Sequence, residues 1–181
     1  ILKENGLTPG EDVQIEWKSE HAECVAALAE HEDAAALLPQ PFVTTAQSKN
    51  DSLRVALDLT EEWDKIQKDN GGNSSLVTGV TVVRTEFAQE HPEIVEDFME
   101  RYQESVSYVN EHIEEAAKLI GDYDIVPEEI AKKALPECNI VYIDGAEMKE
   151  KLSGYLEVLE QENPQAVGGA LPADEFYYDA E

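Results

Sequence analysis

Apolar residues recur at intervals of three and four through several long stretches of this chain, which is the spacing of amphipathic helices. The clearest stretch runs from Pro92 to Glu111 and has proline at the first helical position, where no backbone N–H is needed. The same spacing predicts six more helices: one after Ser19 that ends near His31, residues 42–48, a short acidic-first helix after Thr60, and residues 113–121, 127–135 and 146–162.

Between the earlier helices the pattern changes to that of strands. Val13–Trp17 alternates apolar and polar residues, and Ala34–Leu38 is a continuous apolar run closed by proline. Leu53–Leu59 and Gly79–Arg84 are predicted as two further strands. Strands and helices therefore alternate through about the first 84 residues, which predicts an open α/β sheet. Afterwards helix follows helix, with only a short extended piece at 139–143.

The opening residues have the pattern of a helix that is already ending. Gly6 stands where a helix commonly ends in a left-handed residue, and the chain begins with Ile1 rather than methionine. We therefore expect the given sequence to begin inside a longer chain. Because an α/β part followed by a run of helices makes an odd free-standing domain, we also expect it to be the later part of a two-lobed protein whose chain crosses from one lobe to the other. A lobe separated from its partner exposes apolar surface, so this fragment is expected to self-associate or to swap segments between copies.

The charge of the chain excludes some classes of binding partner. Forty Asp and Glu residues stand against thirteen Lys and Arg, which gives a formal net charge of −27. A surface this acidic repels phosphate backbones and anionic lipid headgroups, so we expect no nucleic-acid partner. The ordinary interpretation of such a charge is solubility, as in secreted, halophilic or alkaliphilic proteins.

The sequence offers little that resembles catalysis. His21, Cys24 and His31 would share one face of an unbroken helix, a spacing that could hold zinc, but Leu28 on the same face favours a core position. The chain has no nucleophile elbow, no P-loop and no dinucleotide-binding glycine motif. Its paired carboxylates stand at predicted helix starts, where they favour the helix dipole. We expect no enzyme activity, no cofactor and no metal.

Four segments, in this order and spacing, resemble a known family. They are AALAEHEDAAALLPQPF (26–42), GVTVVRTEFAQEHPE (79–93), CNIVYIDGAEM (138–148) and NPQAVGGALP (163–172). The set resembles the periplasmic solute-binding proteins of ABC importers in the nitrate, sulfonate, taurine and thiamine-precursor group, over nearly the whole chain. The resemblance implies a type II periplasmic-binding-protein fold, an α/β architecture of two lobes. Residues 1–83 would then be most of the second lobe, and residues 84–181 the hinge return and C-terminal helices that pack on the first lobe.

The resemblance also implies a ligand-facing loop after the Ala34–Leu38 strand. There Gln40 would offer an amide, Phe42 a ring wall, and Thr44 or Thr45 a hydroxyl. Family members commonly have Pro-Glu-Pro-Phe at this place, so Gln40 replaces a carboxylate here. The alternative interpretation is a purely structural turn between a strand and a helix.

The implied function is capture of a small solute without chemistry, followed by delivery to ABC permease subunits. The place would be extracytoplasmic, in the periplasm or at the outer face of the cell membrane, with a lipid anchor. A sulfonate or nitrate would call for helix N-termini and arginine, whereas a pyrimidine would call for aromatic stacking. Two alternatives stay open: a ligand-binding sensory module, and an enzyme similar to thiamine-pyrimidine synthases, which carry a cysteine-rich iron motif that Cys24 and Cys138 do not form.

Overall fold

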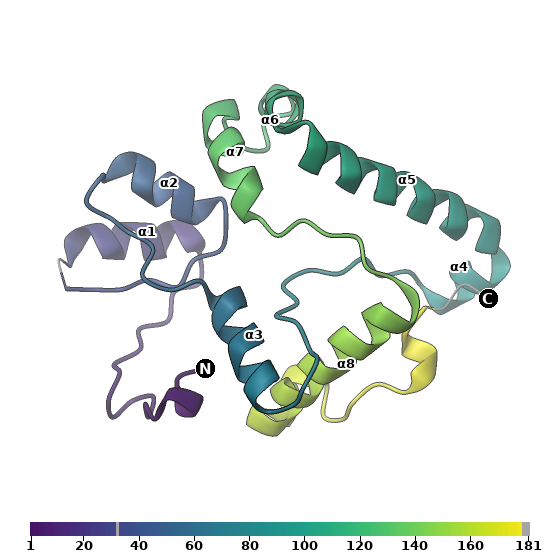
Figure 1. Cartoon of the computed structure of the whole chain (residues 1–181), viewed down its shortest axis with the longest axis horizontal. Coiled ribbons are helices and arrows are strands. Elements are labelled where there is room, and N and C mark those ends of the chain that lie inside the picture. Colours follow the sequence, from purple (N-terminus) through teal and green to yellow (C-terminus); the bar gives the residue numbers. More distant parts are fainter. Residues whose placement is uncertain (32, 179–181) are drawn as a thin grey trace. The chain divides into compact units, whose positions relative to one another are not determined.

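The computed structural model describes residues 1–31 and 33–178, and its regular structure within them is helical (Figure 1). Four short 3₁₀ turns are η1 (Lys3–Asn5), η2 (Leu135–Glu137), η3 (Pro164–Val167) and η4 (Asp174–Phe176). The α-helices are α1 (His21–Glu30), α2 (Phe42–Lys49), α3 (Leu59–Asp69), α4 (Thr85–Glu90), α5 (Pro92–Glu111), α6 (Ile113–Asp122), α7 (Glu128–Ala134) and α8 (Gly145–Glu162). No helix of this described part is both long and apolar enough to cross a membrane.

The chain divides into two compact units, each assembled from segments that lie far apart in the sequence. The first unit consists of Ile1–Val13, Leu57–Met99 and the described residues from Ile143 onward. The second unit consists of Gln14–Ala56 and Glu100–Tyr142. Helix α5 begins in the first unit and ends in the second. The expected division at residue 83 concerns lobes of a larger protein and stays a prediction.

The first unit is held by contacts between α3, the loop that follows it, and α8. The indole ring of Trp63 on α3 lies edge-on to Tyr155 on α8, with ring centroids 5.4 Å apart. Its Nε1–H donates to both the carbonyl oxygen and the hydroxyl of Ser74, each at 3.2 Å. A Cβ on Gly154 would come within 2.8 Å of the Ser74 Cβ, so the absence of a side chain there lets the loop approach α8 closely.

The second unit has a small alanine-rich core between α6 and α7. Ala116, Ala117, Ala131 and Leu135 are buried there, and larger side chains from the ends of α5 and α6 and from Ile140 pack around them. Small residues let the two helices approach closely, which explains why alanines dominate this contact. Helix α2 also packs on α7, and α1 packs on α2 (Figure 1).

Every helix predicted from the spacing of apolar residues is present, with shifts at the ends. Gly6 has φ 73°, the left-handed value expected of it. Helix α3 is capped by Asp58, two residues before the predicted Thr60, and the Asp58 Oδ1 accepts from the backbone N–H groups of Thr60 and Glu61. Helix α1 is capped by Glu20 rather than Ser19. Helix α4 was not predicted.

The predicted strands are not confirmed, and with them the α/β sheet. None of Val13–Trp17, Ala34–Leu38, Leu53–Leu59 and Gly79–Arg84 is a strand in the structure, and Leu59 already belongs to α3. The β-pairing of the described residues is a single isolated bridge between Pro9 and Val13. A strand is defined by backbone hydrogen bonds to a neighbour, and apolar alternation only shows that a segment could be half buried in a sheet.

These connecting segments nevertheless keep the exposed apolar surface that a strand would bury. Val82 and Val83 are both exposed, Val82 by 77%. Leu37 is 73% exposed, and Val55 and Val141 are exposed as well. Within the described residues the backbone groups of residues 76–82 have no hydrogen-bond partner. The sequence pattern is therefore that of strands whose pairing partners these described residues do not supply.

Candidate functional site

The four predicted ligand contacts lie at the start of α2, where they mostly satisfy one another. The Gln40 Oε1 accepts from the backbone N–H of Thr44 at 3.2 Å and from its hydroxyl at 2.9 Å. Thr44 is buried, and the Thr45 hydroxyl donates to the carbonyl oxygen of Pro41 at 3.0 Å. Gln40 therefore acts as a side-chain cap of α2, because it replaces a backbone acceptor in the first turn.

Phe42 contacts a residue that the sequence pattern did not associate with this loop. Its ring stacks on the imidazole of His21, with centroids 4.5 Å apart and an interplanar angle of 28°. His21 is the first residue of α1 and Phe42 the first residue of α2, so the stack joins the starts of two helices. His21 is exposed, whereas Phe42 is half-buried. No local sequence signal links two residues twenty-one positions apart.

The start of α2 has no open backbone donor. The N–H groups of Phe42 and Val43 both donate to the carbonyl oxygen of Pro39, at 2.9 and 3.3 Å. The next two donate to Gln40 and to the carbonyl oxygen of Pro41. An anion bound at a helix start uses such donors, so α2 does not offer them in this conformation.

At the start of α1, backbone N–H groups donate to carboxylates of the chain itself. Glu20 and Glu23 form a capping box, in which each side chain accepts from the other's backbone N–H. The Glu23 Oε2 also accepts from the N–H of Ser19 at 3.1 Å. Two negative groups thus flank His21 along the chain.

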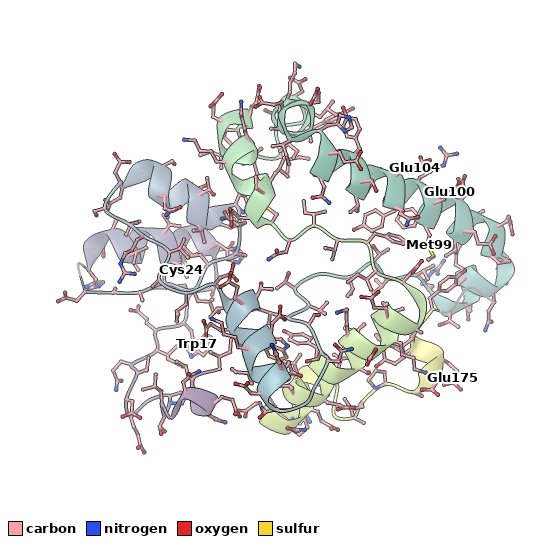
Figure 2. The ribbon with its side chains drawn as sticks, viewed as in Figure 1. Trp17, Cys24, Met99, Glu100, Glu104 and Glu175 are labelled. Atoms are coloured by element: carbon pink, nitrogen blue, oxygen red, sulfur yellow. The ribbon has the colours of Figure 1, made fainter. Side chains whose placement is uncertain are left out.

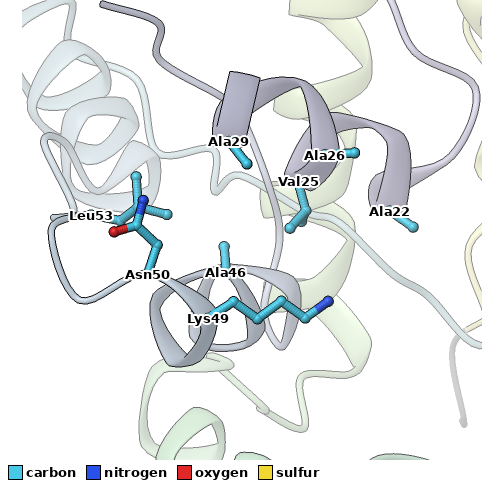
Figure 3. A pocket seen from close by; sticks show the side chains of 8 residues that line it. All are labelled: Ala22, Val25, Ala26, Ala29, Ala46, Lys49, Asn50 and Leu53. Carbon is cyan, nitrogen blue, oxygen red and sulfur yellow. The ribbon is translucent and has the colours of Figure 1, made fainter. Parts of the chain in front are cut away.

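A cavity of about 210 Å³ lies between α1 and α2 (Figure 3). Alanines at positions 22, 26, 29 and 46 leave it open, and Val25 and Leu53 complete its apolar wall. Lys49 and Asn50 are the polar residues that line it. None of Gln40, Phe42, Thr44 and Thr45 lines this cavity, so it is separate from the predicted ligand loop.

The first unit has a polar groove of about 270 Å³ beside α8. It is lined by amides, hydroxyls and two exposed carboxylates, Glu150 and Glu157, together with the loop at Gly72–Ser74. The groove also contains none of the four predicted contacts. Their role as ligand contacts stays a prediction.

The histidine and cysteine residues do not assemble into a metal centre. Helix α1 ends at Glu30 and His31 follows in extended conformation, so the unbroken helix needed to align His21, Cys24 and His31 is absent. Across the residues described, no group of three potential ligands could hold a metal ion. Cys24, on α1 (Figure 2), and Cys138 are both free thiols. Burial, assisted by the charge of Glu137, raises the pKa of the Cys138 thiol above its ordinary value.

Comparison with solved structures shows a close likeness in fold. The chain superposes on the crystal structure of an ABC transporter from Parabacteroides distasonis with a TM-score of 0.77 and 24% sequence identity. The match covers 99% of this chain and 60% of that one. The fold of this chain is therefore that of the corresponding part of the solved structure.

Comparison of sequences finds a local relative. Over 67 residues the chain is 34% identical to a protein of Bacillus subtilis (strain 168) described as a "Putative aliphatic sulfonates-binding protein". The match covers 36% of this chain and 20% of the relative, so the chain spans about a fifth of the length of that protein. No protein-family model matches the sequence. The sequence likeness is confined to 67 residues, and the structural likeness, at 24% identity, shows the fold alone.

Proposed function

We propose that this chain is part of the extracytoplasmic solute-binding component of an ABC importer. The observation that carries the proposal is the fold, which follows a solved ABC-transporter structure along nearly the whole chain. The local identity to a protein described as binding aliphatic sulfonates supports it independently. Both likenesses are to transport proteins rather than to enzymes, so the proposed activity is binding without chemistry.

The proposed mechanism is closure of two lobes on a solute. On this proposal the protein has a partial type II α/β fold, with residues 1–83 in the second lobe and residues 84–181 returning through the hinge. A solute shifts the balance toward the closed form only by as much as it binds that form more tightly. The closed form then docks on permease subunits, and a lipid anchor keeps the protein at the outer face of the membrane.

Within this chain, we assign the solute contacts to the loop before α2. The Gln40 Nε2 makes no hydrogen bond among the described residues, and the Oε1 of the same amide is held by Thr44. The side chain is therefore oriented and has donors to spare. Phe42 supplies an aromatic wall, and Thr44 or Thr45 supplies a hydroxyl, which in this conformation donates to Gln40 or to the carbonyl oxygen of Pro41.

A thermal-shift screen tests the proposed function on this chain and on the full-length gene product. The solutes are sulfonates, taurine, nitrate and pyrimidines. A solute at 100 times its dissociation constant should stabilise the folded state by about 2.7 kcal/mol, a shift of several degrees. We expect one class to give a saturable shift without turnover. Absence of a shift with every class, or appearance of a product, would contradict the proposal.

Variants then locate the site. Gln40→Ala and Phe42→Ala should each reduce the shift at a fixed solute concentration. Gln103→Ala is the matched control, because Gln103 is an exposed amide on α5 outside the loop. If all three variants bind alike, the solute contacts lie elsewhere.

A further inference from the structure

We infer that the α6–α7 turn, residues 119–129, docks on a basic protein surface that has an apolar recess. On the proposed function, on which this inference rests, that surface belongs to the permease, and the turn is the part of this chain that binds it. The basis is a set of exposed apolar side chains on an ordered turn with a concentrated negative charge.

Three large apolar side chains are exposed close together in the α6–α7 turn. Tyr123 is 76% exposed, Ile125 is 69% exposed and Leu119 is 47% exposed. Leu119 and Tyr123 are four residues apart at the end of α6, so they lie on the same side of that helix. Exposed apolar side chains are ordinary when they stand singly, but a group of them with a polar rim is typical of a protein–protein contact site.

The backbone of the turn is fixed by a helix-ending motif. The N–H of Ile125 donates to the carbonyl oxygen of Ile120 at 3.1 Å, and the N–H of Asp124 donates to that of Gly121 at 3.0 Å. Asp124 has φ 54°, the left-handed conformation that this motif requires just after the helix. Since the turn is already ordered, docking costs little conformational entropy in its backbone.

The exposed side chains are not part of the core that joins α6 and α7, which lie side by side in Figure 1. That core consists of four buried residues and the half-buried side chains that pack on them: Ala116, Ala117, Ala131 and Leu135, with Val109, Ile113, Ile120 and Ile140. Leu119, Tyr123 and Ile125 belong to neither group. Substitution of these three is therefore expected to leave the fold intact.

The charge around the turn restricts which partner fits it. From Glu111 to Glu129 the chain has seven carboxylates and one lysine, a net charge of −6 over 19 residues. The whole chain, at −27 over 181 residues, averages only about −3 over the same length. Lys118 is paired with Asp122, whereas Asp124 and Glu129 have no ion-pair partner within the described residues. A second copy of this turn or an anionic lipid surface is repelled by such a charge, and a basic protein surface is attracted.

Photo-cross-linking in the source organism identifies what binds the turn. The full-length gene product is produced with a benzophenone amino acid in place of Tyr123, and the cross-linked protein is identified by mass spectrometry. We expect a permease subunit. The same replacement at Trp17, an 84% exposed ring on the segment before α1, is the matched control and should not cross-link to it. A cross-link between two copies, or no protein cross-link at all from position 123, would overturn the inference.

Outward-facing membrane vesicles from the same organism then measure the affinity. Tyr123→Ser and Ile125→Ser should each weaken binding of the full-length gene product about 5- to 30-fold, the range for loss of one anchor of an interface. Trp17→Ser should bind like the unaltered protein. Circular dichroism establishes that each variant is folded.

A charge variant separates attraction from packing. Asp124→Asn keeps a residue type that accepts the left-handed conformation and removes one carboxylate. It should slow association with the vesicles and reduce the dependence of that rate on salt, while the dissociation rate stays the same. Association that is equally fast and equally salt-dependent in Asp124→Asn would contradict the role of charge in this surface.

The outcomes distinguish this inference from the function on which it rests. If the thermal-shift screen finds a solute while Tyr123→Ser and Ile125→Ser bind vesicles like the unaltered protein, the docking surface is refuted and solute binding stands. Equal binding to vesicles made of extracted lipids alone would also refute the docking surface. If the full-length gene product binds neither a solute nor the membrane vesicles, both proposals fail.

Discussion

Replacement of Trp63 by phenylalanine tests the packing of the first unit. Trp63 is 9% exposed, and its Nε1–H is the donor for two oxygens of Ser74. Phenylalanine removes that donor and leaves buried acceptors without a partner, and it also leaves a cavity where the larger ring had been. From these two effects we expect Trp63→Phe to lower the free energy of unfolding by about 2–4 kcal/mol.

The chain contains its own matched control for this change. Trp17 is 84% exposed, so Trp17→Phe makes the same chemical replacement without loss of packing, and should change stability by less than about 0.5 kcal/mol. Urea unfolding followed by far-UV circular dichroism measures both variants. The fluorescence of Trp17→Phe, which retains Trp63 alone, should shift to longer wavelength as the first unit unfolds. Equal and small effects of the two replacements would refute the described contact of α3, Ser74 and α8.

Two further predictions concern a helix cap and a thiol. Asp58→Ala removes the acceptor for two N–H groups of α3 and should lower the free energy of unfolding, measured in urea, by about 0.5–2 kcal/mol. Asp58→Asn keeps an acceptor oxygen and should keep most of that stability. An equal loss of stability in both variants would show that the charge of Asp58 matters rather than the cap. Burial, with Glu137, raises the pKa of Cys138, so less thiolate forms at a given pH and iodoacetamide should alkylate the folded chain more slowly at pH 8 than the urea-unfolded chain. The difference in alkylation rate between the folded and the unfolded chain should disappear as pH rises past the raised pKa. The variant Cys138→Ser assigns the signal of Cys24. Equal alkylation rates at all pH values would contradict the burial of Cys138.

The helices could be predicted because their causes are local. The i→i−4 hydrogen bonds and the apolar face of Pro92–Glu111 lie within one stretch of sequence, and Gly6 takes its left-handed conformation at a turn that the neighbouring residues specify. The cap positions shifted by one or two residues. Several adjacent side chains can accept the first N–H groups, and only the final geometry selected Glu20 over Ser19 and Asp58 over Thr60.

The strands could not be established from the sequence. Val80, Val82 and Val83 have the composition of a buried strand, but pairing depends on a second segment that alternation does not identify. The described residues form no such ladder here, so the same residues remain exposed. Likewise α4 was missed because its six residues are too few to show a helical period.

In the candidate site, too, some features follow from the local sequence and others depend on the tertiary structure. From the sequence alone, a helix beginning near Phe42 and a turn closed by Pro39 and Pro41 could be predicted, because both causes are local. The structure added that the Gln40 side chain accepts from the N–H of Thr44 at that turn. The stack of His21 on Phe42 was decided by the tertiary structure. It exists because α1 packs against α2, and the packing of two helices depends on the shapes of both surfaces rather than on either sequence pattern.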